Sequence, residues 1–83
     1  MIVVADIGNT RIHIAAFEKS RMIEDWYLLT PRETASENFE LELTEFMKGH
    51  QTLFAKPHFE GWILCSVVPW LTPIFGEMVR NLI

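Results

Sequence analysis

The first thirty residues alternate between short apolar stretches and polar turns, which is the pattern of consecutive β-strands. Residues Ile2–Ala5 form a continuous, mostly β-branched apolar run that is typical of a buried strand. Apolar residues then occupy every second position over 12–17, and strand-forming residues fill Met22–Thr30. The segments between them, Gly8–Thr10 and Glu18–Arg21, are short and polar. Together these stretches predict an antiparallel meander of three strands.

Helical spacing replaces the strand pattern after residue 30. Four apolar residues fall on one helical face, with glutamates crowding the remaining positions: Phe39, Leu43, Phe46 and Met47. Two threonines, Thr30 and Thr34, each precede a glutamate by three positions, as in a capping box. The sequence leaves open which of them begins the helix, and Gly49 supplies its predicted end.

The last third of the chain predicts one further strand and one further helix. A polar connector, His50–Gly61, comes first. Residues Trp62–Val68 are a second continuous apolar run, which predicts a strand buried on both faces, beside Ile2–Asp6 at the centre of the sheet. Apolar residues then recur at helical spacing to the end of the chain, and Thr72-Pro73 supplies the expected helix start.

The predicted order of elements is therefore β-β-β-α-β-α. A meander followed by a helical crossover to a buried strand implies an α/β fold with a mixed sheet and helices on its faces. At 83 residues the chain is expected to form a single domain. Its sequence contains no internal repeat.

Composition narrows the classes of function. A chain of 9.7 kDa has a folded surface of roughly 5,100 Å². The net charge of −4 lacks the basic footprint of nucleic-acid binding, so no nucleic-acid partner is expected. No stretch is long enough to span a membrane and the N-terminus lacks a signal-peptide pattern, so a cytoplasmic protein is expected. The one cysteine, Cys65, is expected to be a small buried hydrophobe.

The stretch Asp6-Ile7-Gly8-Asn9-Thr10 offers the most chemistry. It places a carboxylate at the end of a buried strand, next to a turn whose N–H groups can form an anion-binding nest. Asp6 is suited to Mg²⁺, which binds one or two carboxylates together with phosphate oxygens and water. A plain hairpin turn with no ligand explains the same pattern, and the two interpretations stay open. The three histidines share no ligand-like spacing, and Ser66 is expected to satisfy the end of its strand.

Residues 2–12 resemble the first phosphate motif of the acetate kinase, sugar kinase and actin superfamily. The form Asp-Ile-Gly-Asn-Thr at 6–10 is similar to that of type III pantothenate kinases. The later segment Ser66-Val67-Val68-Pro69 resembles a second segment of the same family, at a fitting separation. The resemblance covers essentially the whole chain.

This resemblance implies a kinase that transfers phosphate from ATP to pantothenate, at the start of coenzyme A synthesis. It implies Mg²⁺, a monovalent cation such as K⁺, and a homodimer of a duplicated ribonuclease H-like, actin-like ATPase fold. Asp6, Gly8, Asn9 and Thr10 match the phosphate-binding motif, with Asp6 as the metal ligand.

The resemblance assigns no catalytic residue to this chain. The catalytic aspartate, the second phosphate motif and the adenosine motif of the family lie beyond Ile83, and Asp25, mid-strand, is a poor substitute. Residues 1–83 are therefore expected to form a single partial ATPase-lobe domain, inactive alone, as a truncated gene product or an excised piece.

Two other functions compete with a phosphotransferase fragment. One is a non-catalytic interaction or transcription accessory protein of the same family. The other is a resolvase-like nuclease, which needs further carboxylates at adjacent strand ends. The isolated chain is also expected to self-associate as a dimer, because Trp62–Val68 would be an open apolar edge and the final helix, with Ile74, Phe75, Met78, Leu82 and Ile83, would add uncovered apolar surface.

Overall fold

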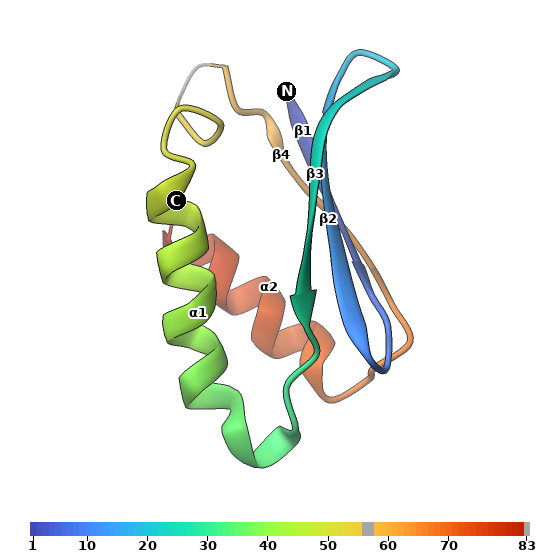
Figure 1. Cartoon of the computed structure of the whole chain (residues 1–83), viewed down its shortest axis with the longest axis vertical. Helices are drawn as coiled ribbons and strands as arrows, with labels where there is room; N and C mark the ends of the chain where they lie inside the picture. Colours follow the sequence, from blue (N-terminus) through green and yellow to red (C-terminus); the bar gives the residue numbers. More distant parts are fainter. Residues whose placement is uncertain (56–57, 83) are drawn as a thin grey trace.

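The computed structural model describes residues 1–55 and 58–82, and their elements follow the predicted order with one added turn of 3-10 helix (Figure 1). The elements are β1 (Ile2–Ile7), β2 (Arg11–Glu18), β3 (Arg21–Leu29), η1 (Glu33–Ala35), α1 (Ser36–Gly49), β4 (Gly61–Ser66) and α2 (Leu71–Leu82). The three-strand meander is confirmed, since β1–β2 and β2–β3 both pair antiparallel.

The four strands form one mixed sheet in the order β3-β2-β1-β4, with β4 parallel to β1. The prediction that β1 and β4 are neighbours is confirmed. The prediction that both are central is wrong for β4, which is an edge strand of the described sheet. Burial of β4 on both faces is also wrong, because Ile63 is 50% exposed and Cys65 is exposed.

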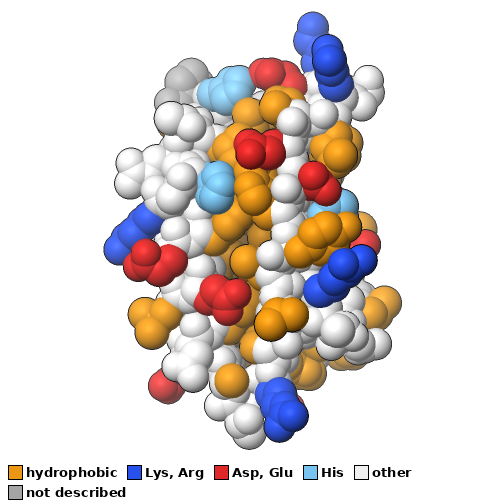
Figure 2. Space-filling model, in the orientation of Figure 1, with side chains coloured by type: hydrophobic (Ala, Val, Ile, Leu, Met, Phe, Trp, Pro, Cys, Tyr) orange, Lys and Arg blue, Asp and Glu red, His pale blue; other side chains and the backbone are white. Residues whose placement is uncertain are grey.

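Both helices pack on the same face of the sheet, which explains the burial pattern (Figure 1). Alternate residues of β1 and β2 turn towards them and are fully buried: Val3, Ala5, Ile7, Ile12, Ile14 and Ala16. Opposite them, Phe39 and Leu43 of α1 and Leu71 and Phe75 of α2 complete the core. Figure 2 shows hydrophobic side chains continuing through the seam between α1 and β3.

Among residues 1–55 and 58–82 no helix covers the opposite face of the sheet, and we call it the open face. It carries Asp6, Arg11, His13, Tyr27 and Ile63, which alternate with the buried residues of their strands. The total accessible surface is 5513 Å², above the roughly 5,100 Å² expected for a compact chain of this mass. A sheet face left exposed to solvent is consistent with a surface larger than expected.

Neither predicted threonine caps α1. The helix follows η1 with Ala35 at its N-cap and no side-chain capping bond. The hydroxyl of Thr30 is instead used elsewhere, donating to the carbonyl of Gly8. The predicted C-terminal end at Gly49 is confirmed, with His50 as the capping residue. The last helix begins at Leu71, so Thr72 and Pro73 lie within its first turn.

The start of the chain is tied to the segment before β4. The N-terminal ammonium donates to the carbonyl of His58 at 2.8 Å and to Oε2 of Glu60 at 2.6 Å. This hydrogen bond, together with the positive charge, holds the pKa of Glu60 below its usual value. The predicted connector includes Pro57, which lies outside the described residues. Within 1–55 and 58–82, neither helix has the length and apolar character needed to cross a membrane.

Candidate functional site

The turn between β1 and β2 carries all four residues of the predicted phosphate motif. The N–H of Gly8 donates to the carbonyl of Arg11 at 3.0 Å and closes the turn. A Cβ at Gly8 would lie 3.0 Å from that same oxygen, so a side chain requires the backbone to shift. Glycine at this position is therefore explained by closure of the hairpin, in addition to any approach of a ligand.

Bonds from two other parts of the chain hold the turn in place. Thr30, directly after β3, donates its hydroxyl to the carbonyl of Gly8 at 2.6 Å and its N–H to the carbonyl of Thr10 at 3.0 Å. On the other side, the N–H of Val67 donates to the carbonyl of Ile7 at 3.0 Å. The turn is thus fixed between the ends of β3 and β4.

The tip of the turn carries N–H groups that are available to bind a ligand. Asn9 and Thr10 are exposed, and within the described parts of the chain their N–H groups donate to no backbone carbonyl. Successive N–H groups in a fixed turn form the kind of concave donor surface that binds anions. These N–H groups can therefore donate to phosphate oxygens without breaking an existing backbone hydrogen bond.

Asp6 lies beside this turn on the open face. In the sheet register it is opposite His13 on β2 and opposite Cys65 on β4. A surface hollow of about 360 Å³ contains Asp6 together with the turn. Its lining consists of the four predicted residues Asp6, Gly8, Asn9 and Thr10, and of Arg11, His13 and Tyr27. The structure therefore brings the four predicted residues into one hollow.

Sequence reasoning missed the polar neighbours that complete the hollow. His13 Nε2 lies 2.6 Å from Oδ2 of Asp25, and its ring stacks on Tyr27 with centroids 4.4 Å apart. The Arg11 guanidinium lies 4.3 Å from the centroid of the Tyr27 ring. Asp25 is mid-strand in β3, as predicted. These residues occupy alternate positions on adjacent strands, which is the only feature of the sequence that could have indicated their proximity. Their pairing depends on a β-bulge that cannot be recognised in the sequence.

The donor set of the hollow suits one particular kind of metal ion. Among the described residues there is no cluster of three histidine, cysteine or acidic side chains that could enclose a metal. Mg²⁺ does not need such a cluster, because it binds through one or two carboxylates and completes its shell with water and phosphate oxygens. Asp6, exposed and next to free N–H donors, fits that requirement.

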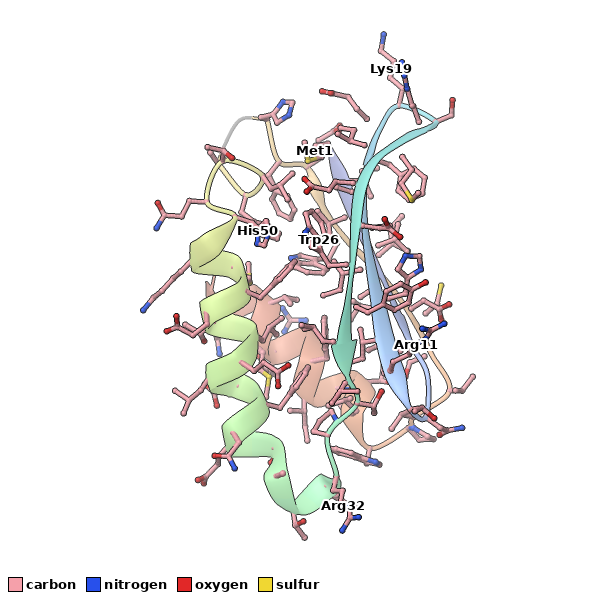
Figure 3. All side chains as sticks on the ribbon, in the orientation of Figure 1. Met1, Arg11, Lys19, Trp26, Arg32 and His50 are labelled. Atoms are coloured by element: carbon pink, nitrogen blue, oxygen red, sulfur yellow. The ribbon has the colours of Figure 1, made fainter. Side chains whose placement is uncertain are left out.

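Three residues outside the hollow have clear local roles. Ser66 accepts the N–H of Val68 at 3.0 Å, which confirms that it satisfies the end of its strand. Cys65 is exposed, so its predicted burial is wrong; its side chain falls on the open face, which no helix covers. His50 lies against Trp26 between β3 and α1, with ring centroids 4.7 Å apart (Figure 3).

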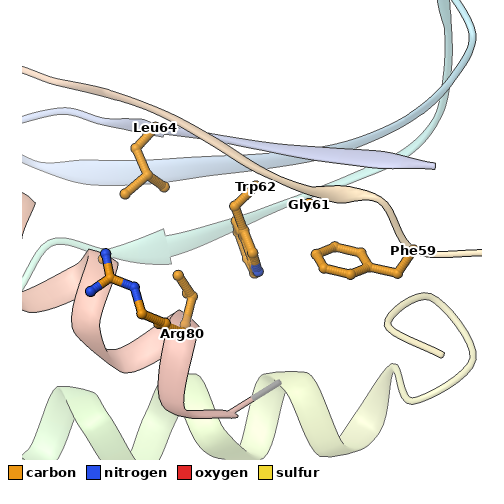
Figure 4. Close-up of a pocket in the computed structure, with 7 residues that line it drawn as sticks. Phe59, Gly61, Trp62, Leu64 and Arg80 are labelled. Carbon is orange, nitrogen blue, oxygen red and sulfur yellow. The ribbon is translucent and has the colours of Figure 1, made fainter. Parts of the chain in front are cut away.

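A second hollow, of about 400 Å³, lies between the edge strand β4 and α2 (Figure 4). Its lining is mainly apolar: Phe59, Gly61, Trp62, Leu64, Gly76, Val79 and Arg80. The Nε1 atom of Trp62 is buried and has no hydrogen-bond partner among the described residues. The hollow is therefore a feature of the unpaired side of β4, separate from the phosphate motif.

The fold and the first hollow together describe a mixed α/β domain with a glycine-containing polar turn after its first strand. The model of the type III pantothenate kinase family matches this chain over residues 2–83. The chain belongs to the type III pantothenate kinase family, which confirms the resemblance drawn from its motifs.

Individual relatives agree with this assignment. The chain is similar to a type III pantothenate kinase of Desulfosudis oleivorans, with 28% identity over 81 residues that cover 98% of this chain and 31% of the relative. It is 30% identical over 80 residues to a type III pantothenate kinase of Dehalococcoides mccartyi strain CBDB1, covering 96% of this chain and 30% of the relative. One from Listeria welshimeri is 30% identical over 78 residues. The chain spans about a third of the length of these relatives.

Proposed function

We propose that this chain contributes the first phosphate- and metal-binding segment of an ATP-dependent pantothenate kinase acting in coenzyme A synthesis. The observation that carries the proposal is that Asp6, Asn9 and Thr10 line one hollow of a chain of this family, and that the N–H groups of Asn9 and Thr10 donate to no backbone carbonyl among the described residues. The four strands would be the beginning of a ribonuclease H-like lobe in an actin-like ATPase. The chain alone is expected not to turn over pantothenate.

Each residue of the motif has a distinct role in this proposal. Asn9 and Thr10 donate N–H groups and side-chain hydrogen bonds to phosphate oxygens, while Gly8 keeps the turn closed. Asp6 provides the carboxylate that holds Mg²⁺, either directly or through water. When bound, Mg²⁺ neutralises charge on the phosphates. A monovalent cation such as K⁺ is proposed from family membership alone.

A nuclease is disfavoured by the neighbours of Asp6. Two-metal cleavage of nucleic acid uses several carboxylates around a pair of ions. The sheet register puts Cys65, not a carboxylate, beside Asp6 on β4, and β4 ends at Ser66. This placement supports phosphate binding with a single carboxylate over the nuclease hypothesis.

Substitution of Asp6 by asparagine tests the metal role. The parent chain is expected to bind Mg²⁺–ATP with a dissociation constant near 1 mM, or about −4 kcal/mol, because the contacts proposed for Asp6 and the turn are to the phosphates and the metal only. Asp6→Asn should weaken binding about tenfold, since the carboxylate is the metal ligand. Amide chemical shifts followed during an Mg²⁺–ATP titration measure both constants.

Glu45→Gln on the exposed side of α1 is the matched control for Asp6→Asn, because it also turns one carboxylate into an amide. It should leave the dissociation constant within a factor of about two, as expected for an exposed charge far from the ligand. Equal binding of Mg²⁺–ATP by the Asp6→Asn variant and the parent would contradict the metal role of Asp6.

We further propose that the chain forms a homodimer through the outer edge of β4. An edge strand presents unpaired N–H and C=O groups, and β4 contains no charged residue to discourage pairing. Ile63 and Val67, 50% and 66% exposed, add apolar surface next to this edge. The sequence also predicts that the last helix adds uncovered apolar surface. This expectation is wrong for Phe75 and Met78, which are buried. Ile83 lies outside the described residues.

Sedimentation equilibrium at micromolar concentration checks the proposed dimer. The parent should sediment with twice its monomer mass, and Ile63→Lys should shift it towards monomer because a lysine on an edge strand disfavours strand pairing. Leu41→Lys on α1, where the side chain is 68% exposed, is the control and should keep the dimer. A parent that sediments at 9.7 kDa would rule out pairing through β4.

A further inference from the structure

Arg11 lines the same hollow as Asp6, Gly8, Asn9 and Thr10, but it is not among the residues assigned above to phosphate or metal binding. It directly follows Thr10, and its side chain projects from the side of the sheet away from the helices (Figure 3). Among the described residues no carboxylate lies within ion-pairing distance of its guanidinium, whereas Arg80 has Glu77 at 3.6 Å. Within the described parts of the chain, Arg11 therefore forms no direct ion pair with a carboxylate.

A chain of contacts on the open face holds this guanidinium near the turn. Arg11 lies over the ring of Tyr27, which stacks on His13 at an interplanar angle of 10°. His13 is fixed in turn by the 2.6 Å contact with Asp25. Long exposed side chains normally lose entropy when they bind a ligand. Stacking on an already anchored ring lowers that loss for Arg11.

We propose that Arg11 is a phosphate-binding residue of this site, positioned by Tyr27. Its guanidinium would form charge-assisted hydrogen bonds to the same phosphate group that the N–H groups of Asn9 and Thr10 bind. The inference rests on the proposed function, because it adds a ligand to the same hollow.

The geometry of arginine makes this role compatible with its stacking. A guanidinium stacks through its flat face, and its N–H donors point outward in the plane, where they can form a bidentate pair with phosphate. The central carbon of the Arg11 guanidinium lies 4.3 Å from the Tyr27 ring centroid, and a face-on contact at this distance would leave the donors available. Arg11 also offsets the negative charge of Asp6 in the same hollow, which would otherwise repel an anion when no metal is present.

Inorganic tripolyphosphate in a buffer with chelator and no Mg²⁺ is the probe that isolates Arg11 from the metal site. We expect Arg11→Gln to weaken tripolyphosphate binding by about tenfold, the size of one lost charge-assisted interaction. Arg11→Lys should lose about threefold, because lysine keeps the charge without the planar donors. The amide signals of Asn9 and Thr10 should follow the titration.

Arg21→Gln is the matched control, since Arg21 begins β3 at the other end of the sheet and its loss changes the net charge equally. It should weaken binding less than about twofold, an effect of long-range charge alone. Equal losses in Arg11→Gln and Arg21→Gln would overturn the assignment of Arg11. A parent chain that binds neither tripolyphosphate nor Mg²⁺–ATP would overturn the proposed function as well.

The two proposals fail separately. If Asp6→Asn leaves Mg²⁺–ATP binding unchanged while Arg11→Gln still weakens tripolyphosphate binding, the metal role is wrong and the role of Arg11 stands. If Asp6→Asn weakens Mg²⁺–ATP binding while Arg11→Gln has no effect on tripolyphosphate binding, the metal role of Asp6 stands and the role of Arg11 is wrong. The same chain and the same amide signals serve both titrations.

The positioning role of Tyr27 has its own readout. Tyr27→Leu should weaken tripolyphosphate binding, whereas Tyr27→Phe should retain it because the aromatic ring is kept. In the Tyr27→Leu background, Arg11→Gln should have a smaller effect than in the parent, as expected of residues that act together. Additive effects of these two substitutions, with unchanged stability, would show that Tyr27 does not position Arg11.

Discussion

Replacement of Phe75 by alanine is expected to remove a large part of the stability of this chain. Phe75 is fully buried on α2, with its ring centroid 6.0 Å from that of Phe39 and 5.8 Å from that of Trp62. Phenylalanine-to-alanine changes in cores cost about 3–5 kcal/mol, through lost burial and the cavity left behind. A domain of 83 residues has a total stability of about 4–12 kcal/mol.

The size of this effect follows from the one-sided core. Because both helices pack on one face, Phe75 joins the sheet to α1, and the part of the chain that the structure describes has no second core on the open face to compensate. Urea denaturation followed by circular dichroism measures the change. Leu41→Ala, at a residue that is 68% exposed, is the control and should shift stability by less than about 0.5 kcal/mol. Equal midpoints for the two variants would contradict this description of the core.

Substitution of Thr30 by valine is expected to destabilise the turn between β1 and β2. Valine keeps the shape of threonine but removes the hydroxyl that donates to Gly8 at 2.6 Å in a partly buried position. Leaving such an acceptor without its partner costs about 1–3 kcal/mol. Amide hydrogen exchange should report the loss locally, as faster exchange of the Gly8 N–H.

Thr34→Val is the control for Thr30→Val and also tests the helix start. Thr34 is exposed and lies within η1, which has no side-chain capping bond in this structure. Its replacement should therefore change stability by less than about 0.5 kcal/mol. A loss of about 1 kcal/mol would instead be the signature of a working N-cap at Thr34.

The elements with the strongest periodicity could be predicted from the sequence. The apolar run of β1 and the alternation of β2 define their strands, and the short turn between them fixes antiparallel pairing. The same reasoning brought Asp6, Gly8, Asn9 and Thr10 together, because they lie within five consecutive residues. Local patterns of this kind require no knowledge of the rest of the fold.

The neighbours of the motif could not be predicted, because they depend on a bulge. The pairing of β2 with β3 shifts between Ala16 and Phe17, and this shift puts His13 opposite Tyr27. With an unbroken ladder His13 would face Trp26, and Trp26 would lie on the open face instead of packing against α1. A single extra residue therefore decides which aromatic side chain enters the core.

The predicted burial of β4 on both faces is wrong for a different physical reason, whereas its expected open edge is confirmed. A continuous apolar run predicts burial on both faces, on the assumption that helices cover both. Here both helices cover the same face, so the outward residues of β4 stay exposed. Thr30 shows the same dependence on distant partners, since its hydroxyl binds a turn 22 residues earlier instead of capping the next helix.

The two edges of the described sheet differ in a way that limits how large an assembly can grow. The β3 edge contains the bulge and carries Glu24 and Asp25, which are features that discourage the addition of strands, whereas β4 has neither. A molecule in which only one edge strand is open to pairing can join one neighbour, related to it by a two-fold axis. If the chain pairs through β4 as proposed, this pairing uses the unprotected edge of both molecules, and we expect closed dimers and not filaments.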